Sequence, residues 1–251
     1  MEIITSRKNQ HIRHFRELLR DRAYRREKGL FVCDGRKLLE EAIECGAEIG
    51  EILFCASPCD MPLPDVPVYG TDEELFRYVS PLENSPGPLF TVHIRSCSAQ
   101  PMPKSVLVLE NVQDPGNVGT VLRTAAAFGT DLVVLCGNCA DPYNPKTVRA
   151  TMGAIFRQRL VETDTEGLPA LLQAWHLPLY GAALAPDARD VRTLPLTEAA
   201  IAVGNEGHGL SDELLTLCAE KIIIPMTPGS ESLNAAVAAA VLQWEMSRNT
   251  L

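Results

Sequence analysis

The chain has 251 residues, of which 46% are hydrophobic and 22% charged, enough apolar material for one large domain or two modest ones. This composition excludes a disordered or fibrous protein. No stretch reaches the roughly 18 to 20 uninterrupted apolar residues that a membrane span needs, and the N-terminal segment lacks the apolar core of a signal peptide. We therefore expect a cytoplasmic protein without membrane contact.

The net charge of −9 argues at first against a nucleic-acid partner, but the charge is unevenly distributed. Residues 1–40 carry 11 Lys or Arg and 6 Asp or Glu, whereas residues 41–251 carry 12 and 26. If the protein binds a polyanion, the N-terminal end is expected to contact it.

Eight cysteines are too few for a disulfide scaffold in a chain of this length, so we expect reduced thiols. Cys136 with Cys139 and Cys55 with Cys59 could together supply four zinc ligands. Both pairs adjoin apolar strand patterns and lack a zinc-knuckle signature, so structural thiols are favoured and no metal site is expected.

The first predicted element is an amphipathic helix that begins over residues 11–20, continues through a further basic stretch and ends at Gly29. Its apolar residues recur at helical spacing, while its arginines share an adjacent face. These charges could form a solvated helix face or contact a polyanion such as a nucleic acid. The candidate nucleic-acid-binding residues are Arg13, Arg16, Arg20, Arg25 and Arg26.

A small α/β unit then continues to Ser98. Its predicted elements are strands at 30–35, 51–55 and 89–95 and helices at 36–46 and 72–79. The following segment contains Pro101 and Pro103 and has no periodicity. We therefore divide the chain into a domain over 1–98, a linker over 99–104 and a second domain over 105–251.

The second domain alternates short apolar strands with helices, which predicts a mainly parallel sheet covered on both faces. The expected strands are 106–110, 131–136, 155–162, 178–184, 200–204 and 221–225, and the expected helices are 117–129, 167–175, 212–218 and 232–246. Ligands of such sheets bind at the loops that follow the carboxyl ends of the strands.

The loop over residues 110–123 follows the first of these strands. Gly116 and Gly119 allow close backbone approach, Asn117 suits a helix N-cap, and Arg123 follows within two helical turns. Taken alone, this loop is equally consistent with a phosphate site and with a capped helix that carries a surface arginine.

Two further loops follow strands in the same way. Residues 203–210 hold three glycines beside Glu206; His208 has no adjacent nucleophile, so we do not expect it to be catalytic. Residues 224–234 lead into an alanine-rich helix, and simple N-capping would explain only one of Ser232 and Asn234.

In this order, the strings DPGNVGTVLRTAAAFG, VGNEGHGLS and IPMTPGSESLNAAVAAAV resemble the three signature motifs of the SpoU (TrmH) branch of the SPOUT RNA methyltransferases. The string from Lys146 to Ala154 is also similar to a family segment. The N-terminal unit, with FVCDGRKLLEEA, resembles the substrate-binding domain, similar to ribosomal protein L30e, that many ribosomal-RNA members carry.

The resemblance implies an enzyme that transfers a methyl group from S-adenosylmethionine to a ribose 2′-hydroxyl in RNA, with ribosomal RNA as the expected substrate. It also implies a C-terminal trefoil knot, which is an exception to the ordinary rules for chain connections. Finally, it implies a homodimer in which two subunits build each site.

By motif position, the resemblance places Gly204, Ile224 and Leu233 in the cofactor pocket. It assigns catalytic positions to Arg123, Asn117, Glu206, Ser232 and Asn234. Arg123 would fix an RNA phosphate and stabilise a developing alkoxide, because a guanidinium normally keeps its proton. Asn117 and Glu206 would position Arg123, while Ser232 and Asn234 would bind cofactor or nucleotide.

Three alternatives remain at this point. The substrate could be transfer RNA, or the chain could be an RNA-binding module that no longer methylates. A dinucleotide-dependent enzyme is the third, but it requires an acidic ribose-binding residue about 20 residues after the glycine-rich turn. Asp131 comes too early, in front of its strand rather than after it.

Overall fold

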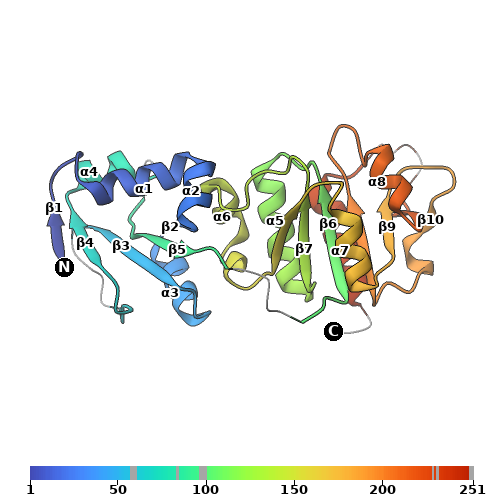
Figure 1. Cartoon of the computed structure of the whole chain (residues 1–251), viewed down its shortest axis with the longest axis horizontal. Helices are drawn as coiled ribbons and strands as arrows, with labels where there is room; N and C mark the ends of the chain where they lie inside the picture. Colours follow the sequence, from blue (N-terminus) through green and yellow to red (C-terminus); the bar gives the residue numbers. More distant parts are fainter. Residues whose placement is uncertain (57–60, 83–84, 96–100, 228, 230–231, 249–251) are drawn as a thin grey trace. The chain divides into compact units, whose positions relative to one another are not determined.

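The computed structural model describes residues 1–56, 61–82, 85–95, 101–227, 229 and 232–248, and most of its elements are labelled in Figure 1. The chain forms two compact units. The first comprises Met1–Ser96 with Asp141–Phe156, and the second Cys97–Ala140 with Arg157–Leu251. The expected linker begins in residues outside the described ones. Residues 141–156, which the sequence pattern placed in the second domain, group with the first unit.

The first unit is built on a five-stranded mixed sheet in the order β1-β4-β3-β5-β2. β4 pairs in parallel with β1 and β3, and β5 runs antiparallel to β3 and β2. The strand bounds are β1 Glu2–Ile4, β2 Leu30–Asp34, β3 Ile49–Cys55, β4 Val68–Thr71 and β5 Leu89–His93.

The helices of the first unit are α1 Gln10–Arg20, α2 Arg22–Lys28, α3 Arg36–Glu44 and α4 Glu73–Val79. α1 and α4 pack their apolar faces on the sheet, with Phe15 and Phe76 in one core cluster. The basic stretch is two helices rather than one, because Asp21 accepts the backbone N–H groups of Ala23 and Tyr24 and so caps α2. Gly29 ends α2 in the left-handed conformation, as expected.

Residues 141–156 carry helix α6 (Pro145–Thr151) and a 3₁₀ turn (Ala154–Phe156) and are held to the first unit by three contacts. Arg25, only 3% exposed, donates to Asp141 Oδ2 from Nε at 3.0 Å and from Nη2 at 2.5 Å. The rings of Phe31 and Tyr143 lie 5.0 Å apart, and Arg95 donates to the carbonyl of Phe156 at 2.6 Å. These partners are remote in sequence, so local patterns could not reveal them.

The second unit contains a seven-stranded sheet in the order β10-β12-β9-β11-β6-β7-β8. All of its strand pairs are parallel, which confirms the predicted α/β class. The bounds are β6 Ser105–Glu110, β7 Leu132–Cys136, β8 Leu160–Thr163, β9 Leu179–Ala182, β10 Arg189–Asp190, β11 Ala199–Val203 and β12 Glu220–Ile223.

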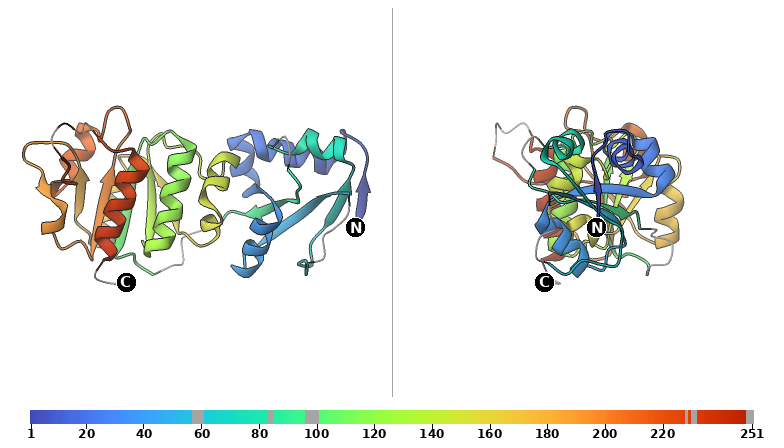
Figure 2. Two further views of the ribbon diagram at one scale, coloured as in Figure 1. Left: turned by 180° about the vertical axis from the view of Figure 1, so that it is seen from behind. Right: turned by 90° about the vertical axis from the view of Figure 1, so that its left-hand side faces the viewer.

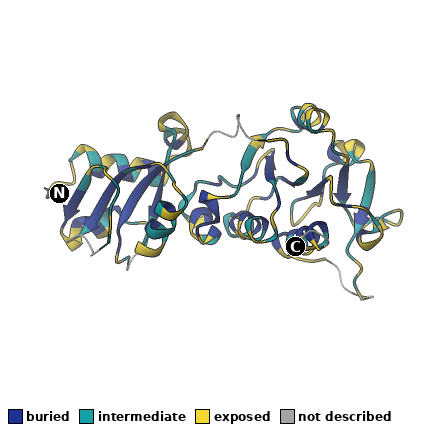
Figure 3. Cartoon of the chain, turned by 90° about the horizontal axis from the view of Figure 1, so that it is seen from below, coloured by how far each residue is buried: buried dark blue, intermediate teal, exposed yellow. Residues whose placement is uncertain are grey.

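Helices cover both faces of this sheet. They are α5 Pro115–Phe128, α7 Leu168–Trp175, α8 Asp212–Leu217 and α9 Ala235–Ser247, with a 3₁₀ turn at Val191–Thr193. α7 and α8 share a core cluster with Val106 and Val108. α5 and α9 lie side by side, joined by a 2.6 Å hydrogen bond from Thr124 to Gln243 (Figure 2). The inner strands of both sheets are buried, whereas the helices expose their outer faces (Figure 3).

The strand expected at 155–162 is shorter than predicted. Met152 and Gly153 both have positive φ, of 48° and 88°, and they turn the chain into the 3₁₀ segment before β8 begins at Leu160. The φ of Gly153 lies in a region that L side chains rarely adopt, so this turn favours glycine.

The buried thiol of Cys139 in the second unit has a structural role. Cys139 donates to the carbonyl of Leu109 at 3.2 Å, and burial raises its pKa to about 11. Cys59 lies outside the described residues. Within the described ranges, no three His, Cys, Asp or Glu side chains form a group that could hold a metal ion, and no helix is long and apolar enough to cross a bilayer.

Candidate active site

The loop after β6 is shaped by its N-cap, which is Asp114 rather than the expected Asn117. Asp114 accepts the backbone N–H of Asn117 at 2.8 Å, and Pro115 occupies the first helical turn of α5. The prediction of Asn117 as N-cap is therefore wrong. Because Asp114 performs the capping, the side-chain amide of Asn117 is available for contacts outside its own helix.

Asn117 joins the three loops that the sequence singled out. Its Nδ2 donates to Oε1 of Glu206 at 2.5 Å, and its Oδ1 accepts from Nδ2 of Asn234 at 3.1 Å. Asn234 is at the same time the N-cap of α9, accepting the N–H groups of Ala236 and Val237. Asn117 is separated in the sequence by 89 positions from Glu206 and by 117 positions from Asn234. The fold brings these three side chains into one polar cluster at the carboxyl edge of the sheet.

The turn over residues 204–209 is tightly folded. Asn205 and Gly209 exchange backbone hydrogen bonds of 3.0 and 2.9 Å, and Asn205 Nδ2 donates to the carbonyl of Asn111 at 2.9 Å. A Cβ on Gly204 would lie 2.1 Å from the backbone carbon of Gly209, so no larger residue fits there without moving the turn. His208 is exposed, and its Nδ1 lies 3.4 Å from Oδ1 of Asn205.

Glu110 anchors this turn from the end of β6, a role that the sequence analysis missed. It is 1% exposed and accepts from the backbone N–H and the hydroxyl of Ser211 at 2.7 and 2.6 Å. The available signal was a carboxylate that ends an otherwise apolar strand, because such a group must find hydrogen-bond donors when it is buried.

A cavity of about 510 Å³ opens beside the polar cluster in the second unit. Gly204, Ile224 and Leu233, the three residues expected to hold a cofactor, all line it, as do Glu206 and Ser232. Its other walls come from the ends of β9 and β12 and from the start of α9. The volume lies within the range of pockets that enclose a small organic molecule.

Arg123 lies apart from this cluster. It is exposed on α5, six residues beyond Asn117, which corresponds to about 9 Å along the helix axis and a rotation of about 240°. In the part of the chain that the structure describes, no hydrogen bond or ion pair connects it to Asn117 or Glu206. The expectation that these two residues position Arg123 is therefore not met within one chain.

The candidate RNA-binding arginines separate into two groups. Arg13 and Arg20 are exposed on α1, Arg26 is exposed on α2, and the Arg16 guanidinium lies 3.7 Å from the centroid of the Tyr78 ring. Arg25 requires a correction: it is buried and paired with Asp141, so its guanidinium is not on the surface. The helical spacing placed it with the basic stripe because the spacing carries no information about its distant partner.

Asp131 also has a structural role. Its Oδ2 accepts the backbone N–H groups of Lys104 and Ser105 at 2.7 and 3.0 Å, at the start of β6. The carboxylate therefore lies at the opposite end of the strands from the ligand loops, so Asp131 cannot be the ribose-binding residue that the dinucleotide alternative requires.

Comparison with known proteins agrees with this geometry. Residues 104–244 match the SpoU rRNA Methylase family. The chain belongs to this family. The matched range contains all three loops, and residues 9–89 match the MRM3-like substrate binding domain. The resemblance expected from the sequence is confirmed, and the N-terminal part corresponds to a substrate-binding domain.

The similarity to known proteins covers nearly the full length of this SpoU family member. It is 33% identical over 250 residues to the 23S rRNA (guanosine(2553)-2′-O)-methyltransferase RlmP of Bacillus subtilis, with 98% of this chain and 99% of that protein covered. It is 29% identical to the mitochondrial rRNA methyltransferase 3A of Danio rerio, covering 92% and 67%. The AdoMet-bound rRNA methyltransferase of Sinorhizobium meliloti superposes with a TM-score of 0.87 at 26% identity, covering 100% and 98%.

Proposed function

We propose that this chain transfers a methyl group from S-adenosylmethionine to the 2′-hydroxyl of a ribose in ribosomal RNA. The observation that carries the proposal is the cluster in which Asn117 connects Glu206 with Asn234, beside a cavity lined by Gly204, Ile224 and Leu233. The full-length similarity to a 23S rRNA 2′-O-methyltransferase supports the reaction, and the AdoMet-bound structure of a similar protein supports the cofactor.

The cavity has the properties that S-adenosylmethionine requires. Ile224, Met226 and Leu233 supply apolar surface for a planar base, and the backbone of the 204–209 turn supplies hydrogen-bonding groups at close range. The bound cofactor would supply a methyl group on a positively charged sulfur. Gly204 allows the turn to close in this shape, because the space that its Cβ would take is filled by the backbone of Gly209 and Leu210.

The polar residues around the cavity hold the substrate in place. Glu206 and Asn234 are fixed by their hydrogen bonds to Asn117, so these side chains lose little further conformational entropy when the reaction takes place. Ser232 lines the same cavity and offers a hydroxyl to cofactor or nucleotide. Arg123 binds an RNA phosphate and stabilises the negative charge that develops on the attacking ribose oxygen.

The separation of Arg123 from the cluster points to a site completed by a second subunit. α9 exposes Val237, Val241 and Trp244 at 50%, 38% and 50%, and these residues lie on one face at helical spacing. A helix that is apolar on all sides is normally buried, so we propose a homodimer that covers this face of α9. Arg123 on the adjacent α5 would then reach the site of the partner chain.

From the family resemblance, we also propose that the C-terminal part of the chain is threaded as a trefoil knot. It would involve the 204–209 turn and the segment from Ile224 to Asn234, both of which line the cofactor cavity. The knot would explain why residues of these two segments line the same cavity.

The test is methyl transfer from tritiated S-adenosylmethionine to purified RNA. We expect label in ribosomal RNA and none above background in transfer RNA. Label in transfer RNA alone would favour the second substrate class. No label in either, in a protein that still binds RNA, would show a module that no longer methylates.

Substitution Gly204→Ala tests the cofactor cavity. The added Cβ would overlap the backbone of Gly209 and Leu210 at 2.1 to 2.4 Å, so the turn must move into the cavity or open. We expect the affinity for S-adenosylmethionine to fall by at least about 100-fold in isothermal titration. Gly207→Ala is the matched control, since its Cβ would meet only Asn205 Oδ1 at 3.5 Å. Equal loss in both variants would contradict the assignment.

A further inference from the structure

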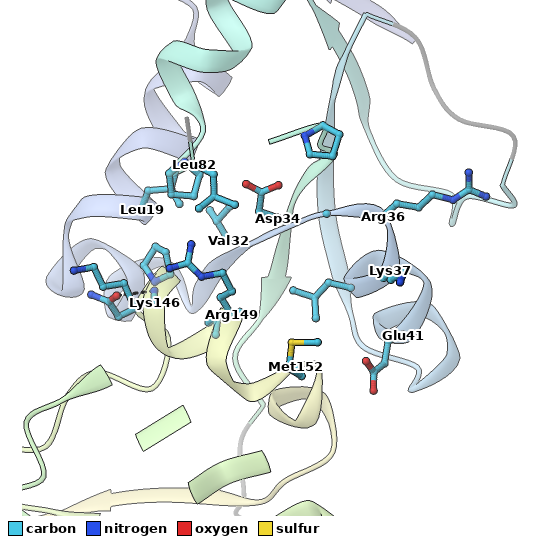
Figure 4. A pocket seen from close by; sticks show the side chains of 17 residues that line it. Leu19, Val32, Asp34, Arg36, Lys37, Glu41, Leu82, Lys146, Arg149 and Met152 are labelled. Carbon is cyan, nitrogen blue, oxygen red and sulfur yellow. Dashed lines mark hydrogen bonds between the residues drawn. The ribbon is translucent and has the colours of Figure 1, made fainter. Parts of the chain in front are cut away.

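A second cavity, of about 650 Å³, lies in the first unit and belongs to no site described above. Its walls come from α1, β2, α3, α6 and the segment before β5, and its apolar lining includes Leu19, Val32, Leu38, Leu82, Val148 and Met152. Figure 4 shows Asp34 among these side chains, while Arg36 points away from them. The cavity is thus mostly apolar and is lined by two carboxylates, Asp34 among these apolar side chains and Glu41 on α3.

Asp34 retains hydrogen-bonding capacity in this position. The hydroxyl of Ser80 donates to its Oδ2 at 3.3 Å, and the hydroxyl of Ser85 donates to its Oδ1. Each carboxylate oxygen has two lone pairs, so each can accept one further donor. Burial raises the pKa of Asp34, while the two serine hydroxyls and the charge of Arg149 lower it. A ligand with two parallel N–H groups would fill both remaining positions.

Cationic side chains line the same cavity. Lys37 lies at the start of α3, and Lys146 and Arg149 lie on α6. Lys146 and Arg149 are exposed, so an anionic group can reach them from solvent. An apolar slot, a carboxylate within it and cations at its edge together match a nucleotide, whose base is planar and whose phosphate is negative.

We propose that this cavity binds a guanine nucleotide of the RNA substrate, with Asp34 accepting the N1–H and N2–H groups of the base. Among the four RNA bases, guanine presents two adjacent N–H donors on one edge, whereas adenine and cytosine present a donor beside an acceptor. The base would lie against the apolar lining of the cavity, and Arg149 would bind phosphate. The inference rests on the proposed function only in taking RNA as the substrate.

The test is the affinity of the full-length protein for fluorescein-labelled pentaribonucleotides, measured by anisotropy without cofactor. We expect UUGUU to bind about tenfold more tightly than UUAUU, the discrimination typical of a two-bond contact to a base. The same RNA with inosine, which lacks the N2 amino group, should bind between the two. This comparison needs no protein variant.

Asp34→Asn should reduce the preference for UUGUU to less than about twofold, since the amide offers one acceptor in place of two. Glu44→Gln, at the exposed end of α3, is the control and should keep the preference. Thermal unfolding of each variant verifies the fold. Equal binding of all three pentamers by the unmodified protein, no binding of any at millimolar concentration, or a preference that survives in Asp34→Asn would overturn the inference.

Guanosine monophosphate distinguishes RNA from a free nucleotide. We expect it to compete with UUGUU only at far higher concentration; competition at equal concentration would show a site for free nucleotides instead. Because none of these readouts involves methyl transfer, guanine preference in a chain that does not methylate would refute the proposed function alone. Loss of the preference in a chain that methylates would refute this inference alone.

Discussion

Replacement of Arg123 by alanine is expected to lower the rate of methyl transfer to ribosomal RNA by about 10²- to 10³-fold, the effect of removing one group that stabilises developing negative charge. Arg123 is exposed and lies outside the described core, so its loss should leave the fold intact. The affinity for S-adenosylmethionine should change little, because Arg123 does not line the cavity. Single-turnover rates and isothermal titration measure the two effects separately.

Arg189→Ala is the matched control for this substitution. Arg189 is an exposed arginine on β10, paired with Glu220 at 2.8 Å, and lines neither cavity. Its loss should leave the rate of methyl transfer unchanged. An unaltered rate in Arg123→Ala would remove Arg123 from the site.

Mixing two inactive variants examines the composite site. Arg123→Ala retains the cofactor cavity, and Gly204→Ala retains the arginine. If Arg123 acts in the partner's site, the mixed dimer contains one complete site, and refolding the variants together should restore activity. If both residues act in one chain, the mixture should remain as inactive as its components.

Replacement of Arg25 by alanine is expected to lower the free energy of unfolding by about 3–5 kcal/mol, the usual result of breaking a buried ion pair. The Arg25 and Asp141 side chains are only 3% and 9% exposed, so the remaining carboxylate would be left without its partner. The carbonyl of Leu18 would also lose the donor that reaches it at 2.5 Å. Urea denaturation measures the loss, and hydrogen exchange of residues 141–156 shows whether α6 opens first.

Two comparisons show whether burial causes the effect. In Arg189→Ala the broken pair with Glu220 is 49% and 37% exposed, so the loss should stay within about 1 kcal/mol. In the double variant Arg25→Met with Asp141→Leu, no charge is left unpaired, and much of the stability should return. An equal loss in Arg25→Ala and Arg189→Ala would contradict the structural role of the buried pair.

The parallel sheet of the second unit was predictable because its strands are short apolar runs between helical segments. Three strands, β1, β4 and β10, were missed. β10 has two residues and β1 three, too few for a period to be recognised, and β4 (VYGT) contains a glycine. The strand expected at 155–162 was too long because the chain turns at Met152 and Gly153, whose positive φ angles an apolar pattern does not indicate.

The part of the candidate site that lies in loops following strands was predictable from the sequence. Three glycine-containing segments after strands identified Asn117, Glu206 and Asn234, and the structure joins these residues by hydrogen bonds. The partners of Glu110 and Arg25 lie 101 and 116 residues away, so no local pattern indicates them. The sequence also did not predict the cavity around Asp34, because its walls come from segments separated by more than 100 residues.

The most direct test of the central claim is the chemical position of the transferred methyl group. Ribosomal RNA lacking the modification would be incubated with the protein and S-adenosylmethionine, digested to nucleosides and analysed by mass spectrometry. We expect one additional nucleoside whose methyl group remains with the ribose after the base is removed. A methyl group found on a base, or no methylated product, would contradict the assignment of the chain as a ribose 2′-O-methyltransferase.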